Sequence, residues 1–248
     1  ARESGANFVT PGALAAVRAR LAAPEKHQTL KEDRLWADLL SSMPLCFNLF
    51  GDLAGDADAC RKSMRTWWPD APDGESRVRF EHSPGRRDPA FLGNKSAFDV
   101  AFEIRASVAS ADTRAIVGVE TKYHEHARKE DPPEDEALAR YVEVTERSGI
   151  FVDGWRERVV GTPLQQIWLD HLLVLAMLQH PSKQWTWGRF VLVYPSANPS
   201  FAAAASRYRE TLVTSDTFEA RMIEDLLAAG TLADGVVAAI RERYVDSP

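Results

Sequence analysis

The sequence has 248 residues, of which 45% are hydrophobic and 27% charged, as in ordinary globular proteins and unlike disordered or fibrous chains. Its longest central apolar run, residues 172–178, is far shorter than the roughly 20 residues of a membrane-spanning helix. Two cysteines cannot supply a disulfide framework or a four-ligand structural zinc site. Because the first residues also lack the pattern of a secretion signal, we expect a cytoplasmic protein with no membrane partner.

Acidic residues outnumber basic ones, 36 to 30, which gives a formal net charge of −6. This balance does not exclude nucleic acid as a partner, because phosphate binding depends on where the cations cluster. The acidic run at residues 129–136 is expected to be a solvated loop. Cations gather among the glycines and prolines of residues 77–95, namely Arg77, Arg79, Arg86, Arg87 and Lys95. This stretch is either a surface that faces DNA phosphates or only a solvated loop.

The N-terminal part of the chain has helical patterns. A first helix is predicted to begin at Thr10-Pro11 and to carry an apolar stripe along residues 14–21. A second helical pattern spans residues 35–43, and Pro44 is expected to interrupt it. The dense apolar segment 45–50 follows and should be buried.

The middle of the chain changes to the two-residue period of β-strands. Residues 77–81, 97–104 and 115–123 are predicted strands, and three consecutive strands favour an antiparallel meander.

After a charged stretch, residues 162–165 form a predicted capping box that opens a helix ending near Pro181. Residues 188–195 are expected to form a buried strand, and the C-terminal extension, about 199–245, to be helical. The order of elements predicts an α/β fold with one central mixed sheet flanked by helices, as a single domain over residues 1–248.

Strand geometry groups three charged side chains. Residues two apart share a face, so Glu120 and Lys122 should lie side by side, while Asp99 should leave the apolar face of Phe98 and Val100. If Asp99 lies on the matching face of a neighbouring strand, two carboxylates and an ammonium meet at one end of the sheet. Such carboxylates suit Mg²⁺, and the lysine could either hold and help deprotonate a water or stabilise developing charge. The alternative is an ordinary ion pair of Glu120 and Lys122 beside an edge acid.

The motif Phe98-Asp99 with Val119-Glu120-Thr121-Lys122 resembles that of the PD-(D/E)XK nuclease superfamily, with Phe98 at the usual proline position. Residues 41–51, 80–85 and 118–125 are also similar to a bacterial restriction endonuclease group within it. The resemblance covers about residues 30–195. It implies a restriction-endonuclease-like core, with extra helices at both ends of the chain.

The resemblance further implies a metal-dependent DNA endonuclease of restriction or phage-defence type, which uses Mg²⁺ and accepts Mn²⁺. By analogy with the superfamily, it could act as a homodimer. Asp99 and Glu120 would be metal ligands, the carbonyl of Thr121 a further ligand, and Lys122 the catalytic lysine. Glu81, at the end of the first strand, is either an additional acidic ligand or a surface acid.

Several polar residues have both a functional and a structural interpretation. Gln165 either faces the site or only completes the capping box. Asn48 is favoured as a buried structural amide, since a polar side chain in an apolar run needs a hydrogen-bond partner. His124 and His126 could bind a transition metal but lack a third ligand, so they are expected either to position DNA or to be only solvated charge. The adjacent pair Asp170-His171 is expected to be surface or packing residues, because helix neighbours point about 100° apart.

A nuclease-fold module that binds nucleic acid or protein, with weak or no cleavage, is the second hypothesis. The complete set of Asp99, Glu120 and Lys122 argues against it, because a chain that has lost its activity need keep none of the three. The choice of DNA over RNA follows from the resemblance alone.

Overall fold

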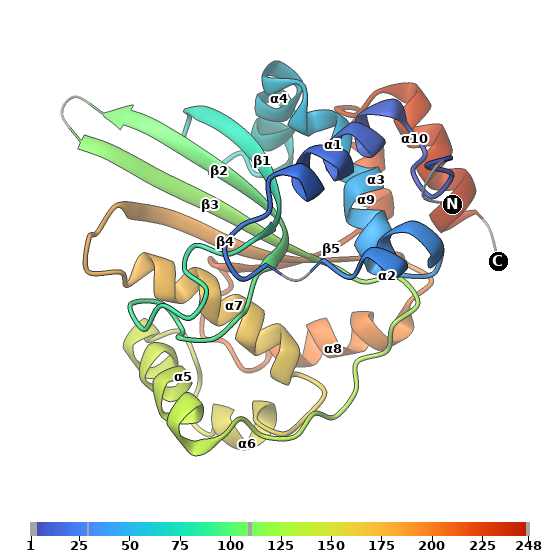
Figure 1. Cartoon of the computed structure of the whole chain (residues 1–248). Helices are drawn as coiled ribbons and strands as arrows, with labels where there is room; N and C mark the ends of the chain where they lie inside the picture. Colours follow the sequence, from blue (N-terminus) through green and yellow to red (C-terminus); the bar gives the residue numbers. More distant parts are fainter. Residues whose placement is uncertain (1–3, 29, 109–110, 247–248) are drawn as a thin grey trace.

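The computed structural model describes residues 4–28, 30–108 and 111–246. A five-stranded sheet in the order β1-β2-β3-β4-β5 forms its centre, with helices on both faces (Figure 1). Its strands are β1 (Glu75–His82), β2 (Phe98–Val108), β3 (Ala111–Thr121), β4 (Trp185–Tyr194) and β5 (Phe218–Met222). The first three pair antiparallel, whereas β4 and β5 run parallel to β3. The predicted meander and mixed sheet are confirmed.

One face of the sheet is covered by helices from the two ends of the chain (Figure 1). These are α1 (Pro11–Ala22), α2 (Glu32–Ala37), α3 (Ser42–Ala54), α4 (Ala57–Trp67), α9 (Ile223–Ala228) and α10 (Asp234–Ile240). An apolar row of Phe80, Val100, Val119 and Val191 lies in register across β1 to β4 and is buried on this face.

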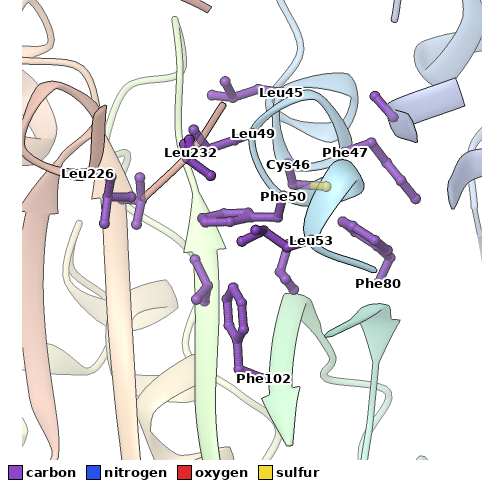
Figure 2. Packing of buried hydrophobic residues seen from close by; sticks show 14 of the residues in the cluster. Leu45, Cys46, Phe47, Leu49, Phe50, Leu53, Phe80, Phe102, Leu226 and Leu232 are labelled. Atoms are coloured by element: carbon purple, nitrogen blue, oxygen red, sulfur yellow. The ribbon is translucent and has the colours of Figure 1, made fainter. Parts of the chain in front are cut away.

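Helix α3 provides the centre of this layer, as Figure 2 shows. The rings of Phe50 and Phe102 meet edge to face at 5.4 Å, and burial of one such side chain stabilises the fold by about 1.5–3 kcal/mol. Gly51 lets α1 approach closely, since a Cβ at this position would lie 2.5 Å from the Cα of Ala13. The predicted burial of segment 45–50 is confirmed.

The prediction that Pro44 interrupts a helix is wrong. Pro44 lies in the first turn of α3, which begins at Ser42 and has Ser41 as its N-cap. The first N–H groups of a helix have no intrahelical acceptor, so a proline there loses no hydrogen bond. The helical pattern seen at residues 35–43 divides instead into the end of α2 and the start of α3.

The other face of the sheet is covered by α5 (Asp135–Ser148), α6 (Trp155–Val159), α7 (Gln165–Leu178) and α8 (Pro199–Arg209) (Figure 1). Helix α5 corrects the expectation of a loop over residues 129–136, because Asp135 and Glu136 form its first turn. Acidic side chains are favourable at that end of a helix dipole. Over the described parts of the chain, no helix is both long and apolar enough to cross a membrane.

The C-terminal extension, predicted to be helical over about 199–245, contains a strand. Residues Phe218–Met222 form β5, which pairs with β4 through Phe190 opposite Phe218 and Leu192 opposite Ala220. The helical prediction is therefore wrong for these five residues, because their conformation is fixed by pairing with β4. After α10 the chain continues as one π-helical turn, Arg241–Val245.

Candidate active site

Glu120 and Lys122 form a close ion pair at the C-terminal end of β3. Lys122 Nζ donates to Glu120 Oε1 at 2.7 Å, and only 8% and 11% of the two side chains are exposed. Gln166, in the first turn of α7, donates from Nε2 to the same carboxylate oxygen at 3.1 Å. The predicted side-by-side placement on one face is thus present, and that face is the one covered by α7.

Asp99 reaches the same strand end from the other side. Its Oδ2 accepts hydrogen bonds from the backbone N of Thr121 at 2.8 Å and from Thr121 Oγ1 at 2.7 Å. Thr121 Oγ1 also lies 3.3 Å from the carbonyl oxygen of Ser42, in α3. The sequence left open whether Asp99 shares the face of Glu120 and Lys122. The structure directs its carboxylate toward Thr121 on the α3 side.

The physical reason lies in Phe98, whose predicted place beside Val100 is wrong. The β2–β3 ladder begins at Val100 opposite Val119, so Phe98 has no partner on β3. Its ring turns to the α7 layer and occupies the space over Gly118, where a Cβ would lie 2.3 Å from Phe98 Cε1. This departure from alternation changes the direction of the next residue, Asp99.

The charges of these groups act on one another. Burial raises the pKa of Asp99 well above its usual range, and the neighbouring Glu120 carboxylate raises it further. Burial lowers the pKa of Lys122, but Glu120, Asp170 and Asp99 outweigh this effect and raise it above its usual range. Lys122 is therefore a protonated ammonium that faces several carboxyl groups.

Glu81, at the end of β1, belongs to this group. Burial raises its pKa to about 7, against the opposing effect of Arg86 and with a further contribution from Glu120. Its backbone is left-handed, with φ at 48°, and its carbonyl accepts a hydrogen bond of 2.7 Å from Arg86. A non-glycine residue in this conformation is uncommon and is often found at functional sites.

Asp170 is a site residue that the sequence did not predict. It lies on α7, one turn after Gln166, and its Oδ2 is shielded from solvent without a hydrogen-bond partner among the described residues. Burial raises its pKa well above the usual range, and Glu120 raises it further. Asp170 follows Gln166 by four residues, and residues four apart share a helix face. This spacing was the sequence signal that could have placed Asp170 beside the site.

Gln165 does not face the site, and its neighbour Gln166 does. Helix α7 begins at Gln165, whose Oε1 accepts from Gly161 N at 2.8 Å and whose Nε2 donates to the Asp131 carbonyl at 2.8 Å. The predicted capping box is also displaced, since Thr162 Oγ1 accepts from the backbone N of Leu164. The helix thus starts later than the pattern indicated.

Asn48 and His124 lie apart from these carboxylates. The Asn48 amide is fully buried, accepts from Val9 N at 2.9 Å and donates to Tyr244 Oη at 2.6 Å, which agrees with the structural interpretation. The exposed His124 ring packs against that of Tyr123 at 4.2 Å.

His171, the neighbour of Asp170, is a packing residue as predicted. It is buried, and its ring nitrogens lie within hydrogen-bond distance of Tyr208 and Thr217.

Three of the predicted DNA-binding cations pair with carboxylates of the protein itself. Arg77 and Arg79 pair with Glu103, and Arg79 and Arg86 bind Glu25 at 2.6 and 2.8 Å. Burial raises the pKa of Glu25, but hydrogen bonding and attraction from His82, among other partners, lower it to about 2. Arg87 and Lys95 are exposed.

Two cavities open near the strands that carry the site, one beside Lys122 and one beside the loop after β1. One of about 310 Å³ is lined by Lys122, Gln166, Arg128 and Phe201, among others. The other, of about 560 Å³, lies between the loop after β1 and the segment after α1. Its basic lining includes Lys26, His27, Arg79, Arg86 and Arg87.

A sequence model of the PD-(D/E)XK nuclease superfamily matches residues 1–246. The chain belongs to this superfamily. Membership implies nuclease activity, and the match extends beyond segment 30–195 to the helices at both ends. No curated protein and no solved structure matches the chain at a significant level. That residues 1–248 form one domain stays a prediction.

Nucleases of the PD-(D/E)XK superfamily usually use divalent metals, and the donor set of this chain fits such an ion. Glu81, Asp99, Glu120 and Asp170 offer only oxygen, and they outnumber the ammonium of Lys122. Over the described ranges, no three or more His, Cys, Asp or Glu side chains are arranged to enclose an ion. Mg²⁺ needs only one or two protein carboxylates, because water and substrate phosphate supply its other ligands.

Proposed function

We propose that the protein is an endonuclease that hydrolyses DNA phosphodiester bonds with Mg²⁺ or Mn²⁺, in restriction or phage defence. The observation that carries the proposal is the pair of Lys122 and Glu120, 2.7 Å apart at the end of β3, next to the Asp99 carboxylate held by Thr121. This set supplies the acidic ligands and the lysine of the superfamily motif.

Each residue has a role that follows from its contacts. Asp99 and Glu120 would hold the ion, with the Thr121 carbonyl as a further ligand and Glu81 as an additional acid. A bound divalent ion would supply positive charge beside the scissile phosphate and make a water more acidic. The surrounding carboxylates raise the pKa of Lys122, which suits a role as an ammonium that orients that water and stabilises developing charge.

The DNA backbone would lie along exposed basic side chains. Lys26, His27, Arg87 and Lys95 are exposed, and the first three line the 560 Å³ cavity. Slight burial and the nearby charges of Arg87, Lys26 and Lys95 lower the pKa of His27, which indicates how closely these cations gather. Phosphates would relieve this repulsion. A homodimer would allow both DNA strands to be cut.

Plasmid cleavage tests this function. Supercoiled DNA incubated with the wild-type protein and Mg²⁺ or Mn²⁺ should be nicked or linearised, and EDTA should stop the reaction. Lys122→Ala should abolish cleavage while DNA affinity in a gel-shift assay stays largely intact. Asp153→Asn, at an exposed acid outside the site, serves as the control. DNA binding without cleavage under any divalent ion would instead favour the nuclease-fold binding module.

A further inference from the structure

Asp170 lies beside the site but is not one of the residues of the superfamily motif. Its Oδ2 is shielded from solvent and accepts no hydrogen bond from the described residues. Buried acceptors nearly always have a donor, so this oxygen needs an explanation. Asp170 shares the inner face of α7 with Gln166, whose amide binds Glu120.

The geometry brings the Lys122 ammonium close to Asp170. Lys122 Nζ and Gln166 Nε2 meet at the same oxygen of Glu120, at 2.7 and 3.1 Å, and Asp170 follows Gln166 by one turn of α7. Among the carboxylates that act on the Lys122 ammonium, Glu120 has the largest effect and Asp170 the next. An ammonium has three protons to donate, and the hydrogen bond described for Lys122 Nζ goes to Glu120 Oε1. Lys122 and Asp170 therefore lie near each other with unused donor and acceptor capacity.

We infer that Asp170 is a positioning residue that takes over the Lys122 ammonium when the Glu120 carboxylate turns to a divalent ion. The inference rests on the proposed function, since it requires that Glu120 be a metal ligand. A cation that binds Glu120 through Oε1 would compete for this oxygen with Lys122 and Gln166.

Without Asp170, metal binding would strip a buried ammonium of its partner, which is strongly unfavourable. Asp99 is not available for this role, because its carboxylate would also bind the ion and its Oδ2 accepts from both Thr121 groups. Asp170 would thus keep Lys122 paired in the metal-bound state and point it toward the water and phosphate.

Mn²⁺ binding, followed by electron paramagnetic resonance without DNA, tests the inference. Asp170→Asn, which keeps the size of the side chain, should weaken Mn²⁺ binding about ten-fold. Asp153→Asn makes the same substitution at an exposed position outside the site and should bind Mn²⁺ like wild type. In a Lys122→Met background, the additional effect of Asp170→Asn should disappear, because there is no ammonium left to position.

The outcomes separate the two proposals. If the wild type binds Mn²⁺ and Asp170→Asn binds it equally well, the inference is overturned and the proposed function stands. The same holds if Asp170→Asn weakens Mn²⁺ binding equally in the wild-type and Lys122→Met backgrounds. Failure of the wild type to bind any divalent ion would overturn both. A wild-type structure with Mn²⁺ needs no variant to fold, and Lys122 Nζ should then lie within hydrogen-bond distance of Asp170. Retention of the Glu120 partner there would overturn the inference.

Discussion

The ring of Phe98 occupies the space over Gly118, so that any side chain at position 118 would collide with it. Gly118→Ala places a Cβ 2.3 Å from Phe98 Cε1, and the ring has to move. We expect a loss of stability of about 1–3 kcal/mol, measured by urea unfolding, together with reduced cleavage because Asp99 follows Phe98 in the chain.

Gly235→Ala in α10 is the matched control for this substitution. A Cβ at position 235 meets nothing within 4 Å, and alanine is the better helix former. Its stability should be unchanged or slightly higher. An equal loss in both variants would contradict the packing argument.

The two adjacent glutamines of α7 should behave differently. Gln166→Ala removes the 3.1 Å hydrogen bond to Glu120 and should lower the cleavage rate by about ten-fold, as is common for residues that orient metal ligands. Gln165→Ala removes bonds to Gly161 and Asp131, and should lower the melting temperature more than the rate per folded molecule. Equal rate losses per folded molecule would refute this division of roles.

The ion network around Glu25 should make stability depend on pH. Its pKa is lowered from 4.5 to about 2, so the carboxylate stabilises the fold fully above about pH 4.5. This contribution is lost as the pH falls toward 2, because the folded state then also takes up the proton. Glu25→Gln should cost about 2 kcal/mol at pH 7 and flatten the decline below pH 4.5 in urea unfolding. Glu157→Gln, at an exposed acid, should retain the wild-type decline.

The exposed cations near the cavity after β1 should govern the salt dependence of DNA binding. Replacing Lys26, Arg87 and Lys95 by Gln should weaken binding at low salt. The slope of log affinity against log salt should fall by about one for each phosphate that these side chains no longer neutralise. Lys62→Gln, an exposed cation on α4, is the control and should leave the slope unchanged. An unchanged slope in the triple variant would place the DNA elsewhere.

Much of the fold could be predicted because most of its strands have a recognisable pattern of apolar residues in their own sequence. Alternating apolar residues identified β2 and β3, and the continuous apolar run of β4 identified a buried strand. Helix α5 was missed because its buried residues Leu138 and Tyr141 are embedded in a highly charged segment. Strand β5 was missed because pairing with β4, and not its own five residues, fixes its conformation.

The candidate site was predictable where it depends on one element. Glu120 and Lys122 belong to the same strand end, so the two-residue period was enough to place them together. The direction of Asp99 depends on where the β2–β3 ladder begins, which sequence periodicity does not reveal. Whether Asp170 faces the site depends on the rotation of α7 about its axis. The sequence pattern placed the start of this helix too early, and Gln165 was considered for the site in place of Gln166.

The most direct measurement is a crystal structure of the wild-type protein soaked with Mn²⁺, with anomalous data to locate the ion. We expect one anomalous peak at the end of β3, in contact with carboxylate oxygens of both Asp99 and Glu120. A peak that touches only one of them, or an ion bound elsewhere with this strand end empty, would contradict a shared metal site and the nuclease mechanism built on it.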